Sequence, residues 1–189
     1  MEIVTSRLVL REFTAADAAA LAAYQADPRA TEFYGPDDVA TVPGLVERFV
    51  AWARESPRRN WQLAIAAREA PAEPLGSCGL RTLDLPRGVA ELGVELAPTA
   101  WGRGYAREAA RALVDWGFPA LDLAEVCAVT VSANARVASL LRRLGFSAAA
   151  TRPGPAWMTA RGWHHVEWRL SRGRWAERGN DPRAERAGA

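Results

Sequence analysis

The residues at 101–106, Trp-Gly-Arg-Gly-Tyr-Ala, have the composition of an anion-binding turn. Two glycines flank an arginine immediately before an alanine-rich segment with helical periodicity. Glycines let the backbone turn so closely that successive N–H groups, and the positive end of the following helix, face one anion. The stretch therefore predicts a pyrophosphate-binding turn. The alternative interpretation is that the two glycines form only a tight connection between a strand and a helix.

Two other phosphate-binding motifs fit this stretch poorly. A dinucleotide-binding motif needs a third glycine in the pattern G-x-G-x-x-G, and position 107 is Arg. A nucleotide-hydrolase phosphate loop needs a lysine, and all 24 basic residues of this chain are arginines. The absence of lysine also excludes Schiff-base catalysis.

Two carboxylates, Glu91 and Glu95, lie in a segment at 88–97 that is expected to be a strand. Strand alternation places both on one face together with Gly93, unless a bulge intervenes. A carboxylate at such a position could act as a general base or hold a water molecule. The alternative is an exposed carboxylate that pairs with an arginine.

The sequence gives little support for covalent or metal-dependent catalysis. Cys78 and Cys127 lie in apolar, strand-like runs, so they are expected to behave as small buried hydrophobic residues. Neither has a recognisable histidine partner, and no G-x-S-x-G motif occurs. His164 and His165 are adjacent in a strand-like run and would point to opposite faces, so they cannot bind one metal together.

Composition indicates one globular domain over 1–171, since 49% of the 189 residues are hydrophobic and 24% are charged. A net charge of +2, with arginines spread along the chain, argues against nucleic acid as a partner. There is no run of eighteen apolar residues and the N-terminus carries charges, so a cytoplasmic protein without a membrane partner is expected. Residues 172–189 are expected to be a polar, mobile tail.

Hydrophobic periodicity predicts alternating strands and helices. A strand at 7–13 precedes helices at 14–26, capped by Thr14 and Asp17, and at 43–56. Three strands at 61–67, 75–85 and 88–97 are expected to form an antiparallel meander. A helix from 105 and a strand at 126–131 then form a strand–helix–strand unit. A helix from Asn134 to Gly145 and two strands at 146–151 and 163–170 complete an α+β pattern.

The segment AELGVELAPTAWGRGYAREAARALVDWGF resembles the acyl-CoA-binding segment of the GNAT acetyltransferase superfamily, specifically its RimJ/RimL-like branch of ribosomal-protein N-terminal acetyltransferases. The segments TSRLVLREFTAADAAAL, ADPRA, NARVASLLRRLGF and GWHHVEWRLS resemble the same branch in the same order, over residues 5–171. The resemblance implies a three-layer α/β arrangement. Its mixed, mostly antiparallel sheet would splay open after the strand that ends near Ala97 and would be flanked by helices.

The resemblance also implies that acetyl-CoA binds in this splay as a co-substrate. Its pantetheine arm would pair with the strand backbone, and its pyrophosphate would lie on the turn at 101–106. The family pattern Q/R-x-x-G-x-G/A aligns with this turn, and Trp101 departs from the usual first residue, which removes only a side-chain donor. Arg103, Arg107, Arg142 and Arg143 could contact phosphates. The residues expected to bind acetyl-CoA are Val94, Leu96, Ala97, Trp101, Gly102, Arg103, Gly104, Tyr105, Ala106, Asn134 and Arg142.

The reaction that the resemblance implies is direct acetyl transfer to an amine in a ternary complex. An amine is protonated at neutral pH and must lose a proton before it attacks the thioester. Glu91 stands where the branch usually has Glu, so it is preferred to Glu95 as the base or water anchor. A strand N–H between Val94 and Leu96 would stabilise the oxyanion. Ser139 would offer its hydroxyl to the CoA sulfur, and Asn134 would bind the pantetheine arm, cap its helix, or do both.

The resemblance favours a protein or peptide N-terminal amine as the acceptor. Two alternatives stay open: a small amine such as an antibiotic or polyamine, or no acceptor at all in a non-catalytic CoA-binding module. The sequence Gly-Pro-Asp-Asp-Val at 35–39 is a faint sign of a polyamine site. Tyr34, Trp52, Trp157 and Trp163 are candidates for an aromatic acceptor groove. His165 stands where the family often has an acid. A homodimer remains an option.

Overall fold

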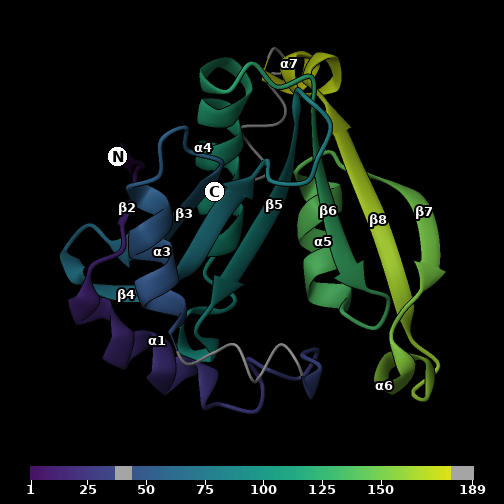
Figure 1. The fold of residues 1–189 in the computed structure, drawn as a ribbon, viewed down its shortest axis with the longest axis horizontal. Coiled ribbons are helices and arrows are strands. Elements are labelled where there is room, and N and C mark those ends of the chain that lie inside the picture. The colour runs from purple at the N-terminus through teal and green to yellow at the C-terminus, as the bar shows by residue number, and fades with distance from the viewer. Residues whose placement is uncertain (37–43, 180–189) are drawn as a thin grey trace.

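The computed structural model of the chain describes residues 1–36 and 44–179, which form three layers with a central eight-stranded sheet between helices (Figure 1). The strands are β1 (Glu2–Val4), β2 (Leu8–Glu12), β3 (Asn60–Ala67), β4 (Ala70–Arg81), β5 (Val89–Leu96), β6 (Glu125–Val131), β7 (Ser147–Pro153) and β8 (His164–Ser171). The helices are η1 (Ala15–Asp17), α1 (Ala18–Gln25), α3 (Leu45–Ala53), η2 (Pro98–Ala100), α4 (Tyr105–Ala120), α5 (Ala135–Arg143), α6 (Ala156–Thr159) and α7 (Arg172–Gly179).

The sheet has the order β1-β2-β3-β4-β5-β6-β8-β7. The described strands pair antiparallel except for β5 and β6, which are parallel and are connected through α4. The meander of β3, β4 and β5 and the strand–helix–strand unit are therefore confirmed. The structure has the mixed, mostly antiparallel α/β architecture that the sequence predicted.

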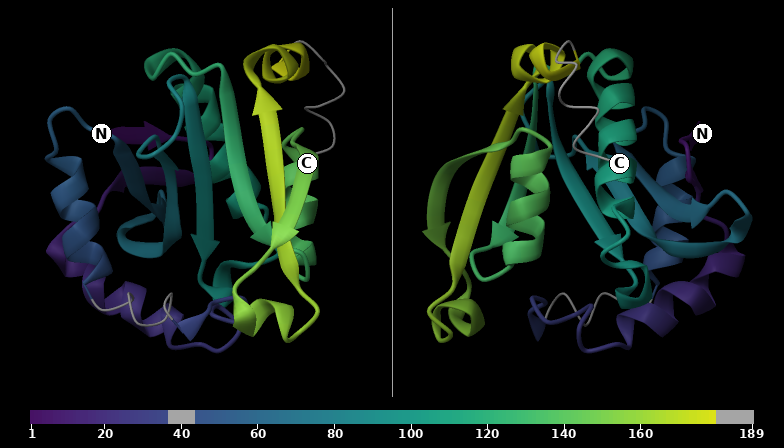
Figure 2. Two further views of the ribbon diagram at one scale, coloured as in Figure 1. Left: turned by 45° about the vertical axis from the view of Figure 1, so that its right-hand side comes forward. Right: turned by 180° about the vertical axis from the view of Figure 1, so that it is seen from behind.

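One face of the sheet is covered by α4 and α5, which lie in front of the strands in the right-hand view of Figure 2. The buried residues of α4 on this face are Ala109, Ala110, Leu113 and Val114, and they pack against leucines of β2, β3 and β4. Leu141 and Leu144 cover the part of the same core formed by β6 and β8. The alanines let α4 lie close to the sheet, and burial of the leucines supplies most of the stabilisation of this layer.

The opposite face carries α1 and α3. Its core contains Phe13, Leu21, Tyr24, Val46 and Phe49. The start of the α1 segment is fixed by Asp17, which is 2% exposed and bonded to Arg11 at 2.7 Å. The Thr14 N–H also donates to Asp17 at 2.7 Å, so the predicted capping box is confirmed. This anchoring fixes α1, whose last turn carries Tyr24 and Gln25.

The sheet is open between β5 and β6. The two strands pair only at Val89, Ala90 and Glu91, opposite Glu125, Val126 and Cys127. Beyond the pair of Glu91 and Cys127 they diverge toward the lower end of Figure 1, where α6 and the segment after α1 lie. We call this unpaired region the β5/β6 gap. Backbone groups that face the gap have no strand partner, so they can pair with an extended ligand.

Three details differ from the sequence-based expectations. Strand β1 was not predicted. Strand β4 begins at Ala70 rather than 75, because its two prolines lie near the hairpin end, where the ladder with β3 has register shifts that tolerate them. Residues 172–179 form α7 instead of the start of a mobile tail, since the Trp175 side chain packs on Phe118 and donates to Asp115 at 2.8 Å.

Of the described residues, no helix is both long and apolar enough to cross a membrane. The predicted helix start at Pro43 lies outside the described residues, and α3 follows Gly44.

We expect Leu113→Ala to lower the free energy of unfolding by about 2–5 kcal/mol, because its side chain is fully buried between α4 and the sheet and truncation leaves a cavity. Urea denaturation of the purified protein measures this change. Leu83→Ala is the matched control, since Leu83 is 38% exposed, and its effect should stay within about 0.5 kcal/mol. Equal effects of the two substitutions would contradict this assignment of the core.

Candidate active site

The glycine turn, Trp101–Ala106, has the geometry of an anion-binding helix start. Gly102 and Gly104 have φ values of 76° and 78°, a left-handed conformation that favours glycine. The first intrahelical bond of α4 joins the Glu108 N–H to the Gly104 carbonyl at 3.1 Å. The N–H groups of Tyr105 and Ala106 therefore have no acceptor within the helix, and they lie at its positive end. These groups fit a phosphate or pyrophosphate.

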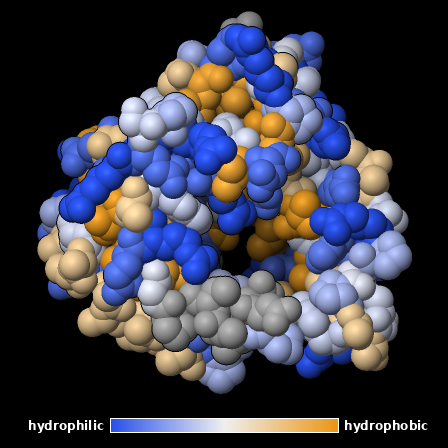
Figure 3. Space-filling view, viewed as in Figure 1, coloured by the Kyte–Doolittle hydropathy of each residue, from blue (hydrophilic) through white to orange (hydrophobic). Residues whose placement is uncertain are grey.

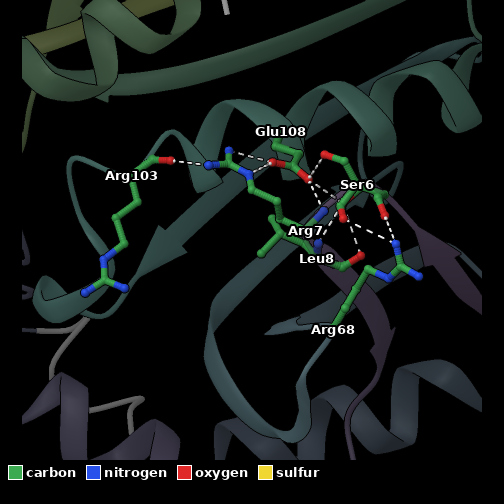
Figure 4. A network of polar contacts seen from close by, with 7 residues as sticks. Ser6, Arg7, Leu8, Arg68, Arg103 and Glu108 are labelled. Carbon is green, nitrogen blue, oxygen red and sulfur yellow. Dashed lines mark hydrogen bonds and ion pairs between the residues drawn. The ribbon is translucent and has the colours of Figure 1, made fainter. Parts of the chain in front are cut away.

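A polar network connects the N-terminal segment to the glycine turn (Figure 4). The Glu108 carboxylate accepts hydrogen bonds from the Thr5 hydroxyl at 2.6 Å, the Ser6 hydroxyl at 3.0 Å and the Arg7 N–H at 2.9 Å. Arg7 Nε donates to the same carboxylate at 2.7 Å, and Arg7 Nη1 donates to the Arg103 carbonyl at 2.9 Å. We call these contacts the Arg7–Glu108 network. It holds both the first turn of α4 and the loop before it.

The electrostatics of this network favour an ionised Glu108. Partial burial acts to raise the pKa of Glu108, but the hydrogen bonds from Thr5, Arg7 and Ser6 outweigh it and hold the pKa below its ordinary value. The Arg7 guanidinium also lies over the Tyr105 ring, 4.9 Å from its centroid. Sequence reasoning assigned no role to Arg7 or Glu108, because the two residues are 101 positions apart and only the fold brings them together.

Trp101 has a structural role that the sequence did not predict. Its indole Nε1 donates to the Leu96 carbonyl at 2.8 Å, so this position supplies a donor that ties the turn to the end of β5. The expectation that Trp101 merely removes a donor was wrong. Arg136, at the start of α5, lies 4.3 Å from the centre of the Trp101 ring and pairs with Glu32 at 3.1 Å. Arg136 thus connects α5 with the turn and with the segment after α1.

Fewer backbone groups of β5 are available to a ligand than the sequence predicted. The Ala97 N–H donates to the Leu75 carbonyl at 2.8 Å, and the Ala97 carbonyl accepts from the Ala100 N–H at 2.8 Å. Both groups of Ala97 are thus used within the chain, which corrects its predicted role in ligand pairing. Antiparallel pairing with β4 alternates, so the backbone groups of Val94 and Leu96 point away from β4 and toward the gap. The Leu96 carbonyl already accepts from Trp101 Nε1, so the groups offered to a ligand are those of Val94 and the Leu96 N–H.

Glu91 lies at the last paired position before the gap opens. Its carboxylate pairs with Arg81 Nη2 at 3.0 Å, across the β4–β5 ladder. This is the arrangement that the sequence offered as the alternative to a catalytic carboxylate. An exposed ion pair of this kind contributes little to stability, and it holds the carboxylate away from the open end of the gap.

Glu95 lies four residues further along β5, on the same sheet face and toward the open end of the gap. Among the described residues, its Oε1 atom is buried and has no hydrogen-bond partner. Burial raises the pKa of Glu95, and hydrogen bonds with Tyr34 and Gln25 oppose the increase without cancelling it. A partly desolvated carboxylate with a raised pKa is suited to accept a proton near neutral pH.

Polar side chains surround Glu95 on the α1 side. Ser77 lies opposite Glu95 in the β4–β5 ladder, and its hydroxyl accepts from Gln62 Nε2 at 3.1 Å. The Tyr24 hydroxyl is buried beside them, and its pKa is raised by burial and then by the charge of Glu95. The carboxylate of Glu95 therefore belongs to a polar cluster inside an otherwise apolar layer, which is typical of a functional site.

The structure places the three predicted site residues on and near α5 in different surroundings. Asn134 Oδ1 accepts from the Val137 N–H at 3.2 Å, so its helix-capping role is confirmed. Ser139 lies half-buried in the middle of α5. The Arg142 guanidinium lies over Trp168, 5.3 Å from the ring centre. Arg142 does not line the small basic cavity between α4, α5 and α7, whose arginines are Arg107, Arg111, Arg143 and Arg178.

The predicted aromatic groove is also only partly formed. Trp157 and Trp163 pack edge to face with ring centres 6.5 Å apart, and Phe33 lies 5.6 Å from Trp163. Trp52 instead packs on Phe49 in the α1/α3 core. Tyr34 contacts Glu95. The acidic pair at 37–38, a sign of a polyamine site, lies outside the described residues.

The two thiols are poor nucleophiles in this structure. Burial raises the pKa of Cys78 to about 12. Burial, followed by the charge of Glu91, raises the pKa of Cys127 to about 11. Both thiols are therefore protonated at neutral pH, and neither contributes a thiolate to the site.

A helix start with unpaired N–H groups, an open parallel strand pair and a desolvated carboxylate fit a group-transfer enzyme with an extended, phosphorylated donor. Residues 7–147 match the family model described as acetyltransferase (GNAT) domain. The uncharacterized N-acetyltransferase YoaA of Bacillus subtilis (strain 168) is 30% identical over 145 residues, which are 75% of this chain and 80% of YoaA. The chain belongs to the GNAT acetyltransferase family.

Two solved structures show the same fold. The ribosomal-protein-S5-alanine acetyltransferase from Vibrio fischeri has a TM-score of 0.74 at 17% identity, with 93% of this chain and 98% of that chain covered. Spermidine N-acetyltransferase from Vibrio cholerae, in complex with CoA and spermine, has a TM-score of 0.76 at 15% identity, with 91% and 99% covered. The protein is an acetyl-CoA-dependent N-acetyltransferase, and its relatives in fold act on different kinds of acceptor.

We expect Gly104→Ala to weaken CoA binding about tenfold or more, a loss of roughly 1.4 kcal/mol. A Cβ at Gly104 would adopt a strained φ and would lie 3.4 Å from Arg7 Nη2, which disturbs the turn and the Arg7–Glu108 network. Isothermal titration calorimetry with CoA measures the affinity. The matched control is Gly162→Ala, where φ is +70° and no atom lies within 4 Å of the added Cβ. Unchanged CoA affinity in Gly104→Ala would contradict the assignment of the turn.

Proposed function

We propose that this N-acetyltransferase transfers the acetyl group of acetyl-CoA to the N-terminal amine of a peptide or protein, by direct attack in a ternary complex, with Glu95 as the general base. One observation carries the catalytic assignment. Glu95 presents a buried carboxylate oxygen without a partner at the open end of the β5/β6 gap, where an amine and a thioester can meet.

The donor side fits acetyl-CoA. The N–H groups of Tyr105 and Ala106 would hold the pyrophosphate, and the backbone groups of Val94 and the N–H of Leu96 would pair with the pantetheine amides. The Arg7–Glu108 network keeps the glycine turn in position for this contact. Asn134 would meet the pantetheine arm at the start of α5, on the other side of the gap.

The acceptor amine enters as an ammonium and transfers one proton to the Glu95 carboxylate. The neutral nitrogen then attacks the thioester carbonyl carbon, and a β5 N–H at Val94 or Leu96 stabilises the negative charge that develops on the carbonyl oxygen. The carbon–sulfur bond breaks as the amide forms. The departing thiolate accepts a hydrogen bond from Ser139 and takes up the second proton that the nitrogen loses, which gives the free thiol. Glu95 then releases the first proton to solvent and returns to its charged form.

The contrast between the two carboxylates decides the choice of base. The Glu91 carboxylate is already engaged in an ion pair with Arg81 Nη2 at 3.0 Å, at the closed end of the gap. Glu95 has the opposite environment, because burial destabilises its charged form. A carboxylate that disfavours its own charge is costly for folding, so its presence also argues against a non-catalytic CoA-binding module.

The preference for an N-terminal amine comes from the RimJ/RimL-like segments of the sequence, together with the fold shared with the S5-alanine acetyltransferase. A thiol-release assay with acetyl-CoA tests it, with peptides that have free or blocked N-termini, aminoglycosides and polyamines as acceptors. The proposal predicts release that requires a free N-terminus. CoA binding without thiol release for every amine would overturn it in favour of a binding module.

We expect Glu95→Gln to lower kcat about a hundredfold or more, because the amide cannot accept the proton of the ammonium. The matched control is Glu91→Gln on the same strand and face, which breaks only the pair with Arg81 and should change kcat less than about threefold. Steady-state kinetics at saturating acetyl-CoA compare the two variants. An equal or larger loss in Glu91→Gln would assign the base to Glu91 instead.

The raised pKa of Glu95 predicts that an increase in pH raises the activity of the wild type and lowers the stability of its fold. Since the pKa of Glu95 is raised, the wild-type rate should fall as the pH drops through that raised pKa, and Glu95→Gln should lack this limb. A carboxyl with a raised pKa in the folded state stabilises the fold below its unfolded pKa and loses that contribution as the pH rises. At pH 8, therefore, Glu95→Gln should unfold at an equal or higher temperature than the wild type, which also shows that its low activity does not come from unfolding.

A further inference from the structure

We infer that the acceptor amine carries one apolar substituent of aromatic or branched aliphatic size, and that this substituent occupies a cavity next to Glu95. The inference rests on the proposed function and specifies its substrate class. The cavity has a volume of about 240 Å³. We call it the aromatic cavity; its lining residues are Phe33, Gly35, Val129, Thr130, Val131, Pro155, Trp157, Met158 and His165.

The aromatic cavity adjoins the proposed base through three consecutive residues. Phe33 and Gly35 line the cavity, and Tyr34 between them contacts Glu95. The segment 33–35 therefore contributes both to the wall of the cavity and to the surroundings of Glu95. Figure 3 shows a hollow on this face of the molecule, with hydrophobic side chains on its walls.

The size and lining of the cavity fit one apolar side chain. A buried cavity of roughly 150 Å³ lined by aliphatic and aromatic groups accommodates a benzene molecule, so the aromatic cavity has room for a phenyl or isobutyl group. The two valines, the proline, the methionine and the aromatic rings present carbon atoms. The Thr130 hydroxyl accepts from Trp168 Nε1 at 2.9 Å, so part of its hydrogen-bonding capacity is used within the protein.

The charges near the cavity disfavour a second cationic group on the acceptor. Aromatic faces attract ammonium groups, but here the Arg161 guanidinium lies 5.5 Å from the ring centres of both Trp157 and Trp163. A polyamine would therefore bring a cation toward an existing one. Among the described residues that line the cavity there is no carboxylate to compensate.

The cavity is preformed rather than assembled by the ligand. Trp157 lies directly on Gly35, since a Cβ at that position would be 2.3 Å from Trp157 Nε1. Phe33 and Trp157 both pack against Trp163, and these contacts fix the wall formed by the segment after α1. A preformed apolar cavity binds its substituent without ordering the loop first, and this lowers the cost of selecting an acceptor.

The first experiment compares acceptors with the wild-type enzyme. The acceptors are tripeptide amides that begin with Phe, Leu or Gly, together with phenethylamine and spermidine, all with saturating acetyl-CoA. The inference predicts that kcat/KM for the Phe and Leu peptides exceeds that for the Gly peptide by about 10- to 100-fold, as burial of an apolar group in a pocket allows. Phenethylamine carries the same apolar group as the Phe peptide but no peptide backbone, so comparing their kcat/KM values distinguishes a small amine from a peptide as the acceptor. A higher kcat/KM for spermidine than for the Phe peptide would overturn the inference.

The second experiment fills the cavity. In Val131→Phe the new ring occupies the space, so the ratio of kcat/KM for the Phe peptide to that for the Gly peptide should fall about tenfold. Val4→Phe is the matched control, because Val4 is 56% exposed on β1, and it should keep the wild-type ratio. An unchanged ratio in Val131→Phe would overturn the inference.

A second variant tests the same cavity in case Val131→Phe does not fold. Should Val131→Phe not fold, Phe33→Ala enlarges the same cavity and should shift preference from Phe toward Trp as the first residue. An unaltered preference in Phe33→Ala would overturn the inference. The two levels of the proposal fail separately: absence of thiol release with every amine contradicts the proposed function, whereas turnover that ignores the apolar substituent contradicts only the assignment of the aromatic cavity.

Discussion

The separation of β5 from β6 after the pair of Glu91 and Cys127 is the constraint on which the site depends. A parallel strand pair that stops early leaves N–H and C=O groups without partners in the middle of a sheet, which is unfavourable unless another group binds them. The sheet stays together because α4 and α5 share one core across both halves. The gap is thus a stable opening, and a donor with amide groups can complete the hydrogen bonding that the sheet leaves open.

In the proposed function, the elements on one face of the sheet bind the acetyl donor and those on the other face bind the acceptor. On one face, the glycine turn and the start of α5 surround the donor side, and the Arg7–Glu108 network fixes the turn from the N-terminal segment (Figure 4). On the other face, α1 and the segment after it approach the gap, anchored by the buried pair of Arg11 and Asp17. In the proposed function, donor and acceptor would therefore reach one point from opposite sides, as a direct transfer requires.

The role proposed for Glu95 as the base would set activity against stability in this fold. Its carboxylate is desolvated and only partly satisfied, within a cluster of Tyr24, Gln25, Tyr34 and Ser77. Such a group destabilises the folded state in its charged form, whereas the pairing of Glu91 with Arg81 is the ordinary solution for a strand carboxylate. Two glutamates on one face of one strand thus have different chemistry because of their surroundings alone.

The sequence by itself determined the parts that depend on local rules. It predicted the antiparallel meander, the strand–helix–strand unit, the glycine turn before α4, the Asn134 cap and the GNAT resemblance, since periodicity, caps and turn residues act over a few positions. The tertiary structure alone decided which carboxylate is desolvated, that Ala97 is already bonded to Leu75, that Arg7 meets Glu108, and that α7 forms where a mobile tail was expected. These outcomes depend on burial and on contacts between residues far apart in the chain, which no local pattern encodes.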